Sequence, residues 1–212
     1  MFKLALLGCI GSGKSTTCEI LSKREKVRLF VENFEDNPFI KSFYSDECEE
    51  NKRSKNIFAL QMWFLDEYLR VALSAKSYKS YIIDAGALAG LAFVTAQTNL
   101  KLMSKYEHDL YFSLWKKVFL EGNGLDRTCK YIIIDREVPD LMSKIAKRGR
   151  PHERDMKEFF IREVKESYAK LPKMLEGTGL DIRVMKCSVS ESREMIAKRV
   201  KDLYESMSVE LI

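Results

Sequence analysis

Short apolar runs of strand length recur along the chain, and the longer stretches between them show the three-to-four-residue spacing of amphipathic helices. The predicted strands are Phe2–Leu7, Val27–Val31, Tyr81–Ile83, Tyr131–Ile134 and Ile182–Cys187. The predicted helices are Lys14–Ser22, Lys52–Ala75, Leu88–Leu100, Lys105–Leu120, Val138–Lys147, Met156–Leu175 and Ser190–Met207, the last with a capping box formed by Ser188 and Glu191. Strands that alternate with helices predict an α/β fold with a five-stranded parallel sheet flanked by helices.

Composition favours one domain over residues 1–212, because no Pro-, Gly- or Ser-rich linker divides the chain. The apolar start is too short for a membrane span and lacks a cleavage-site pattern, so we expect neither a targeting segment nor a membrane partner. The five cysteines are scattered without CxxC spacing, which favours a reducing cytoplasm over a disulfide framework or a zinc site. With two histidines, a His-based metal cluster or a Ser-His-Asp triad is not expected.

The formal net charge of +5 is unevenly distributed. Residues 141–175 carry ten Lys or Arg against five Asp or Glu. This excess is compatible with binding of phosphates or nucleic acid, although a solvated helical face explains most of these side chains. Nucleic acid is therefore an open alternative and not the favoured partner.

A phosphate-binding motif directly follows the first predicted strand. Residues 8–15 read GCIGSGKS and match GxxxxGK[ST], for which a plain glycine-rich turn is the weaker alternative. In such a loop backbone N–H groups turn toward phosphates, Lys14 neutralises the β and γ oxygens, and Ser15 offers its hydroxyl to Mg²⁺ at the start of a helix. The motif predicts binding of ATP with Mg²⁺ through Gly8, Gly11, Ser12, Gly13, Lys14, Ser15 and Thr16.

Two acidic residues terminate predicted strands. Glu32 follows the second strand and Asp84 follows the third. Ligands of parallel sheets bind beyond the carboxyl ends of the strands, so both carboxylates are expected at the same edge as the phosphate loop. In phosphoryl transfer, Asp84 would hold Mg²⁺ and Glu32 would accept the proton of the attacking hydroxyl. Ordinary turn residues at strand ends are also acidic, which is the alternative interpretation.

A basic segment, KIAKRGRPHE at 144–153, ends a predicted helix at Gly149. We interpret residues 148–155 as a lid whose cations gather around the transferred phosphoryl group. A solvated helix terminus, with glycine closing the helix and cations offsetting its dipole, is compatible with the same residues.

Together these segments resemble the deoxyribonucleoside kinase family, whose P-loop NTPase fold is similar to that of thymidylate kinases. The resemblance covers roughly residues 2–170 and includes the phosphate loop, VENFEDNPF at 31–39, FALQ at 58–61 and RGRPHE at 148–153. The second of these resembles the E-P-V-x-x-N-P-F segment, particularly in bacterial purine-preferring members. The resemblance implies that the chain phosphorylates the 5′-hydroxyl of a deoxyribonucleoside with a purine or modified base.

The resemblance also implies individual roles. Glu32 would be the base at the 5′-hydroxyl, and Gln61 would read the nucleobase. Arg148 and Arg150 would be the lid cations, and Glu153 would contact the sugar 3′-hydroxyl. Tyr44 is similar to the sugar-contacting tyrosine of the family. Many aromatic residues lie in the segments that would line this pocket, and Phe34 and Phe93 are the ones we expect to stack on the base, although a core position is the alternative for each.

Two departures from the family pattern concern the pocket. After Asp84 the family shows Arg-Ser and a later Asp, whereas this chain has Ala85 and, further on, Gly90. Tyr68 stands where many members carry an Arg that pairs with the later Asp. Loss of both charges predicts a neutral, roomier pocket that tolerates bulk near Gly90. The candidates to replace the Arg missing at Ala85 are Arg28, Arg70 and Arg136.

Alternatives to a deoxynucleoside kinase remain open. One is a kinase of another acceptor, such as a nucleoside monophosphate, a modified nucleoside or a hydroxyl on DNA. Another is a nucleotide-binding regulatory protein without efficient catalysis, which Ala85 motivates. The apolar stretch 88–120 is compatible with the homodimer that the family resemblance implies, and equally with a monomer core.

Overall fold

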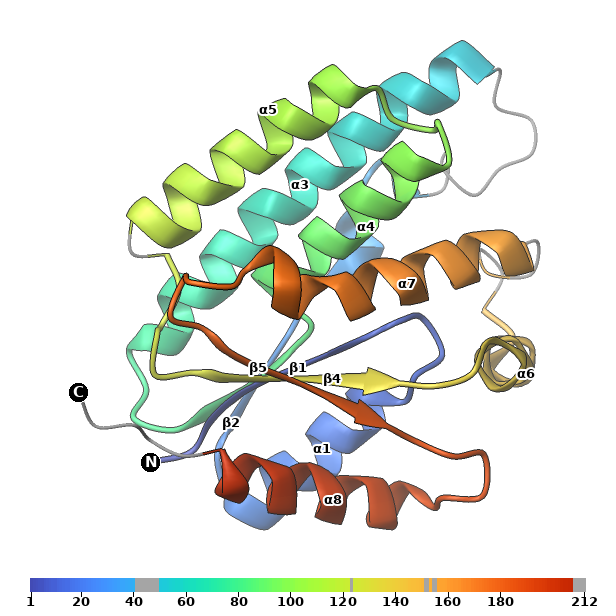
Figure 1. Cartoon of the computed structure of the whole chain (residues 1–212). Helices are drawn as coiled ribbons and strands as arrows, with labels where there is room; N and C mark the ends of the chain where they lie inside the picture. The colour runs from blue at the N-terminus through green and yellow to red at the C-terminus, as the bar shows by residue number, and fades with distance from the viewer. Residues whose placement is uncertain (41–49, 123, 151–152, 154–155, 208–212) are drawn as a thin grey trace.

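The computed structural model describes residues 1–40, 50–122, 124–150, 153 and 156–207, with side chains described from residue 56 onward in the second range. A parallel sheet forms the centre of the molecule (Figure 1). Its strands are β1 (Lys3–Gly8), β2 (Arg28–Val31), β3 (Tyr81–Asp84), β4 (Lys130–Asp135) and β5 (Asp181–Lys186), in the order β2-β3-β1-β4-β5. Every strand pair is parallel, so the predicted five-stranded parallel sheet is confirmed.

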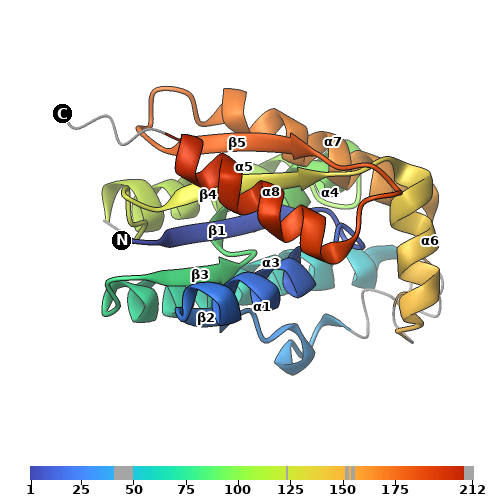
Figure 2. The same cartoon turned by 90° about the horizontal axis from the view of Figure 1, so that it is seen from below.

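Helices cover both faces of the sheet (Figure 2). The helices are α1 (Lys14–Glu25), α3 (Glu50–Lys76), α4 (Ala87–Asn99), α5 (Lys105–Trp115), α6 (Val138–Arg148), α7 (Glu158–Met174) and α8 (Arg193–Ser206), with a 3₁₀ turn η1 (Phe34–Asp36) and a short π-helix η2 (Lys116–Glu121). No helix in the part of the chain that the structure describes combines the length and apolar content needed to cross a bilayer.

Alternation along the strands builds two cores. In β1, Leu4 and Leu6 point toward α1 and α8, whereas Ala5 and Leu7 point toward the layer of α3, α4, α5 and α7. This is the two-residue period of a strand with both faces buried, and it explains why the strand reads as a continuous apolar run. The larger core contains Trp115, whose indole N–H donates to the backbone oxygen of Ala87 at 2.9 Å.

The capping of two helices differs from the sequence-based expectation. The backbone N–H of Ser188 donates to the Glu191 carboxylate at 2.6 Å, but this pair forms a turn ahead of α8 and is not the predicted helix cap. The cap is Ser192, whose side chain accepts from the backbone N–H of Met195, because the helix begins later than its apolar period indicates. A complete capping box is instead formed by Ser104 and Glu107 at the start of α5.

The sheet register brings chemically important strand ends together. Leu6 of β1 and Val31 of β2 both lie opposite Asp84 of β3. The glycine-rich loop leaves β1 at this edge, and Glu32 leaves β2 there. The carboxyl edge of the sheet therefore carries the phosphate loop and both strand-end acids, as the sequence predicts.

Candidate active site

The glycine-rich loop wraps around the N-terminus of α1. Gly11 has φ +81°, and a Cβ on it would lie 2.8 Å from the backbone oxygen of Leu141, so only glycine fits there. The backbone N–H of Ser12 donates to the oxygen of Cys9 at 3.1 Å, which closes the turn. Gly13 has φ +89° and precedes the first residue of the helix, Lys14. The free N–H groups of this helix end and its dipole make the loop an anion-binding site.

Arg136 is hydrogen-bonded to the backbone of the phosphate loop. This buried side chain donates through Nε to the backbone oxygen of Ser12 at 2.9 Å and through Nη1 to that of Ser188 at 3.0 Å. It also forms a buried ion pair with Asp140 at 2.6 Å. Its guanidinium is therefore engaged by the protein and also lines a second cavity behind the loop.

The other two candidates for the missing arginine lie elsewhere. Arg70 forms ion pairs with Asp66 and Glu67 on the same helix, and Arg28 lies over the ring of Phe30. Neither belongs to the wall of the cavity that opens at the carboxyl edge of the sheet. Among the candidates named from sequence, Arg136 is the one that the structure places next to the phosphate loop.

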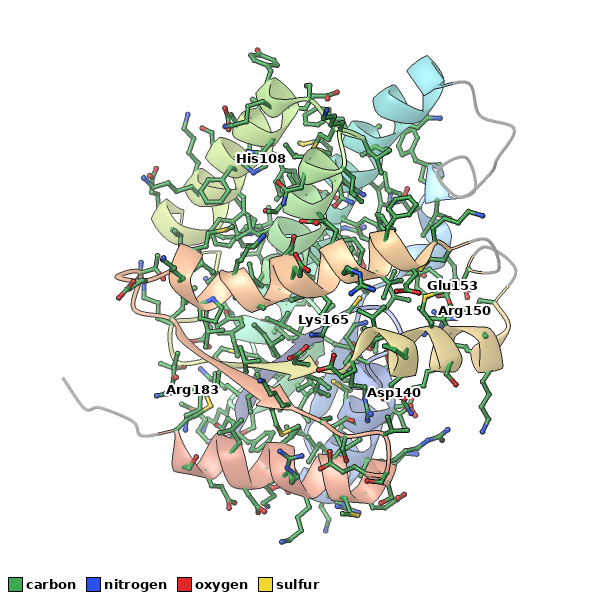
Figure 3. The ribbon with its side chains drawn as sticks, turned by 45° about the vertical axis from the view of Figure 1, so that its right-hand side comes forward. His108, Asp140, Arg150, Glu153, Lys165 and Arg183 are labelled. Carbon is green, nitrogen blue, oxygen red and sulfur yellow. The ribbon has the colours of Figure 1, made fainter. Side chains whose placement is uncertain are left out.

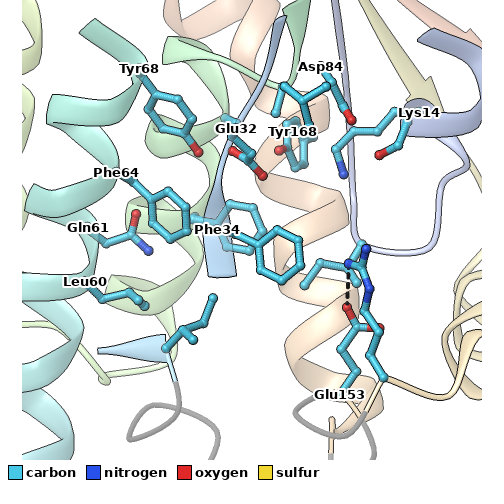
Figure 4. Close-up of a pocket in the computed structure, with 18 of the residues that line it drawn as sticks. Lys14, Glu32, Phe34, Leu60, Gln61, Phe64, Tyr68, Asp84, Glu153 and Tyr168 are labelled. Carbon is cyan, nitrogen blue, oxygen red and sulfur yellow. Dashed lines mark ion pairs between the residues drawn. The ribbon is translucent and has the colours of Figure 1, made fainter. Parts of the chain in front are cut away.

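The cavity at this edge, which we call the acceptor cavity, has a volume of about 260 Å³ and opens beside the phosphate loop (Figure 4). Its wall combines residues from the loop, strand ends, α3, α4, α7 and the lid segment. The predicted site residues in this wall are Lys14, Ser15, Glu32, Phe34, Gln61, Tyr68, Asp84, Phe93, Arg148, Arg150 and Glu153. Tyr44 lies outside the described residues, so its predicted contact stays a prediction.

Glu32 lies at the junction of the loop and the cavity. Burial raises the pKa of its carboxyl group to about 7, the Lys14 ammonium opposes the shift, and the Asp84 carboxylate adds to it. A hydrogen bond from the Tyr68 hydroxyl also stabilises the ionised form, whereas Oε2 has no hydrogen-bond partner among the residues described. A carboxylate with a pKa near neutrality and a free oxygen can accept a proton from a bound hydroxyl.

Asp84 and Ser15 are the predicted magnesium ligands. Asp84 is buried at the end of β3, and its Oδ1 finds no partner within the described ranges, so a hard cation suits this oxygen. In the described part of the chain, no three His, Cys, Asp or Glu side chains form a metal cluster. A magnesium ion held here would thus take its remaining ligands from nucleotide oxygens and water, as this ion commonly does.

The residue after Asp84 has an unusual backbone conformation. Ala85 has φ +70°, and its N–H donates to the backbone oxygen of Leu6 at 3.0 Å. A left-handed conformation at a non-glycine residue costs roughly 1–2 kcal/mol. Ala85, at the position where the family pattern has an arginine, therefore forms a strained turn in the cavity wall, and its side chain is only a methyl group.

Described charged residues of the lid segment lie near the end of α6, where Figure 3 labels Arg150 and Glu153. Arg148 forms a two-pronged ion pair with the buried Glu153, at 3.0 Å from Nε and 2.6 Å from Nη2. Arg150 lies 3.6 Å from Glu153 and stacks its guanidinium over Phe34 at 4.7 Å. Gly149, with φ +67°, ends the helix as predicted.

The prediction of extra room near Gly90 is wrong. A Cβ on Gly90 would overlap the hydroxyl oxygen of Tyr111 and lie 3.2 Å from Cε2 of Tyr68. Both tyrosines are buried, and they occupy the volume that the absent Arg–Asp pair was expected to vacate. The two tyrosines are uncharged, as expected, but they pack closely and leave no extra room, because protein interiors are close-packed.

The second cavity, which we call the donor cavity, has a volume of about 540 Å³ and lies on the other side of the phosphate loop. Its wall includes Gly11, Gly13, Thr16, Arg136, Lys144, Lys147, Arg148, Glu191, Ser192 and Arg193. Arg148 borders both cavities, so one lid cation lies between them. The predominance of cations suits a polyanionic ligand.

Sequence reasoning missed Tyr168 and Gln97, two polar residues of the acceptor cavity, as well as Glu19 of α1. Tyr168 of α7 lines the wall and packs its ring edge against Phe93, at 6.2 Å between centroids. Gln97 of α4 lines it as well. Neither belongs to a motif, and the single hint was a glutamine within a mostly apolar helix. Phe58, the first residue of the segment FALQ, packs against the larger core and does not line the cavity.

A loop of this geometry holds phosphates, and a carboxylate of raised pKa beside it is suited to take a hydroxyl proton, so fold and site together define a P-loop phosphotransferase. Residues 4–207 match the family described as deoxynucleoside kinase. The chain therefore belongs to the deoxynucleoside kinase family, and it is an enzyme that phosphorylates a deoxyribonucleoside. The family, fold and reaction predicted from the sequence are confirmed.

Individual relatives agree with this assignment. The chain is 28% identical over 220 residues to the deoxyguanosine kinase of Lactobacillus johnsonii, covering 96% of this chain and 94% of that protein. It is 26% identical over 188 residues to the deoxyguanosine kinase of Bacillus subtilis, covering 86% and 84%. A structure of deoxyadenosine kinase from M. mycoides with bound dATP superposes with a TM-score of 0.79 at 21% identity, covering 96% of this chain and all of that one.

Proposed function

We propose that this enzyme transfers the γ-phosphoryl group of ATP to the 5′-hydroxyl of a purine 2′-deoxyribonucleoside. The observation that carries the proposal is Glu32, whose buried carboxyl group lies between the phosphate loop and a cavity lined by aromatic and amide side chains. The deoxyguanosine kinases among its relatives support a purine acceptor. A nucleoside in the cavity would present its 5′-hydroxyl to Glu32 and its base to α3 and α4.

On the acceptor side, Glu32 takes the proton of the 5′-hydroxyl as the oxygen attacks phosphorus. Gln61 offers an amide donor and an acceptor to the edge of the base, and Phe34 and Phe93 flank its faces. Tyr68 positions Glu32 through its hydrogen bond. Once a sugar is bound, Glu153 contacts its 3′-hydroxyl. We propose that Tyr44 contacts the sugar as well.

On the donor side, the phosphate loop binds the triphosphate of ATP, with Lys14 at the β and γ oxygens. Ser15 and Asp84 would hold Mg²⁺, which supplies positive charge to the β and γ oxygens during transfer. Arg148 and Arg150 place further positive charge on the cavity side of the loop. The base and sugar of ATP would enter the cation-rich donor cavity, between the loop and the start of α8.

We also propose that the protein forms a homodimer and acts in the cytoplasm. Tyr106 and Leu110 are apolar side chains exposed along α5, at 78% and 40%. An exposed apolar helix face supports pairing of two copies through this helix. Light scattering coupled to size exclusion measures the mass in solution, and Leu110→Lys would convert a dimer to a monomer.

The acceptor is tested by ADP release from ATP·Mg²⁺ across a panel of nucleosides, deoxynucleosides, monophosphates and single-stranded DNA. We expect deoxyguanosine or deoxyadenosine to give the highest kcat/KM and deoxycytidine a lower one. Highest activity on a monophosphate or DNA would favour the alternative acceptors. Tight ATP binding without turnover on any acceptor would favour the regulatory protein.

A further inference from the structure

Gln97 is a buried polar side chain whose hydrogen-bonding groups the described residues do not satisfy. Its side chain is 0% exposed, and neither Nε2 nor Oε1 has a hydrogen-bond partner in the part of the chain that the structure describes. The same residue belongs to the wall of the acceptor cavity. Buried amides are nearly always hydrogen-bonded, so a cavity-lining amide with both ends free points to a bound ligand as the partner.

The amide has no role in closing its own helix. The backbone oxygen of Gln97 accepts from the N–H groups of Leu102 at 2.8 Å and Met103 at 3.2 Å. The N–H of Leu100 donates to the oxygen of Ala96 at 3.0 Å. Backbone groups thus satisfy the end of α4, and a helix cap does not explain a glutamine at this position.

Helix geometry brings Gln97 to the same depth as Gln61. Helices α3 and α4 lie side by side and run in opposite directions (Figure 1), with Tyr68 facing Gly90 across the contact. Gln61 precedes Tyr68 by seven residues, and Gln97 follows Gly90 by seven. At 1.5 Å per residue both amides lie about 10 Å from that contact, in the same direction along the helices.

The intervening residues of α4 follow the same face. Ala89, Phe93 and Gln97 are spaced four apart, and all three line the acceptor cavity. This spacing places them on one stripe of the helix, with Phe93 one turn closer to the reacting groups than Gln97. The stripe therefore offers a ring for stacking and then an amide for hydrogen bonding, in the order in which a nucleoside would meet them from its sugar end.

We propose that Gln97 is a second nucleobase-reading residue, which hydrogen-bonds the polar edge of the base opposite Gln61. The proposal rests on the nucleoside kinase function proposed above. A carboxamide carries one acceptor and a two-proton donor, which complement both the lactam edge of guanine and the amidine edge of adenine. Because no group among the described residues holds either end of Gln97, the amide can turn to present whichever end the base requires.

The test combines one substitution in the protein with one substrate analogue that lacks the groups to be recognised. Gln97→Met keeps the length and an unbranched chain but removes the amide. Wild type and variant are compared on deoxyadenosine, deoxyguanosine and purine 2′-deoxyriboside, which lacks the exocyclic groups. We expect the variant to lose about 10-fold in kcat/KM on the first two, mainly through KM, and less than about 2-fold on the third. The KM for ATP stays unchanged.

Matched controls separate this role from packing. Thr95→Val changes a polar side chain of α4 that is outside the cavity wall and should leave all three substrates unaffected. If Gln97→Met does not fold, Gln97→Asn, which keeps the amide but withdraws it, is expected to show the same selective loss. An equal loss on all three substrates, or no loss on any, overturns the inference. Failure of the wild type to phosphorylate any of them overturns the proposed function instead.

Discussion

Glu32 makes the reaction pH-dependent at the scale of a single residue. Burial raises its pKa to about 7 against the opposing charge of Lys14. Only the carboxylate accepts a proton, so we predict that kcat/KM for the nucleoside declines as the pH falls through about 7, approaching tenfold per unit on the acid side. A pH–rate profile at saturating ATP measures this. A profile that stays flat from about pH 5.5 to 8 contradicts the role of Glu32.

Replacement of the same residue separates chemistry from binding. Glu32→Gln keeps the size and a hydrogen bond to Tyr68 but removes proton acceptance, so kcat should fall by about 10²–10⁴-fold. The affinity for ATP should barely change, because the triphosphate is bound by the loop and Lys14. Single-turnover kinetics and ATP titration provide the two readouts. Near-normal turnover would reduce Glu32 to an ordinary strand-end acid.

Gly90 provides a prediction about packing. Gly90→Ala should destabilise the fold by about 1–3 kcal/mol, because the new methyl group overlaps the Tyr111 hydroxyl. That hydroxyl has no hydrogen-bond partner among the described residues, so Tyr111→Phe alone should cost little. In the Tyr111→Phe background the cost of Gly90→Ala should shrink. Urea denaturation of the four proteins gives the coupling, and strictly additive costs would contradict this packing.

At the scale of elements, we expect the lid segment to act through the ion pairs of Glu153. Arg148 borders both cavities, so Arg148→Ala should lower kcat more than it raises the KM for the nucleoside. Glu153→Ala should mainly raise that KM, because we assign Glu153 to the sugar. Steady-state kinetics with each substrate varied distinguish the two patterns. Identical effects of both substitutions would mean that the segment acts as a single structural unit.

Local sequence signals predicted the elements well, and their ends less well. The apolar runs located all five strands: β1, β3 and β4 are buried on both faces, and the edge strands β2 and β5 are partly buried. The start of α8 was misplaced because Ser188 and Glu191 have the spacing of a capping box while forming only a turn. Local hydrogen bonds of this kind occur in both settings, and tertiary packing decides between them.

At the scale of the whole molecule, sequence reasoning assigned to the site residues that lie in recognisable motifs. It did not find polar cavity residues that lie outside any motif. Lys14, Glu32 and Gln61 lie in segments with a recognisable pattern, and all three line the acceptor cavity. Gln97 and Tyr168 reach it only because α4 and α7 pack together over the sheet. Such a placement depends on helix register between distant segments, which no local pattern encodes. The filling of the space beside Gly90 by Tyr111 has the same origin.

The most direct test of the central claim follows the γ-phosphoryl group itself. The enzyme is incubated with Mg²⁺, γ-labelled ATP and either deoxyguanosine or deoxyadenosine, and the labelled product is identified by mass spectrometry and ³¹P NMR. We predict a deoxynucleoside 5′-monophosphate carrying the label, formed by the wild type and not by a folded Lys14→Ala variant. Label released as inorganic phosphate, or attached at a position other than the 5′-oxygen, would contradict the account.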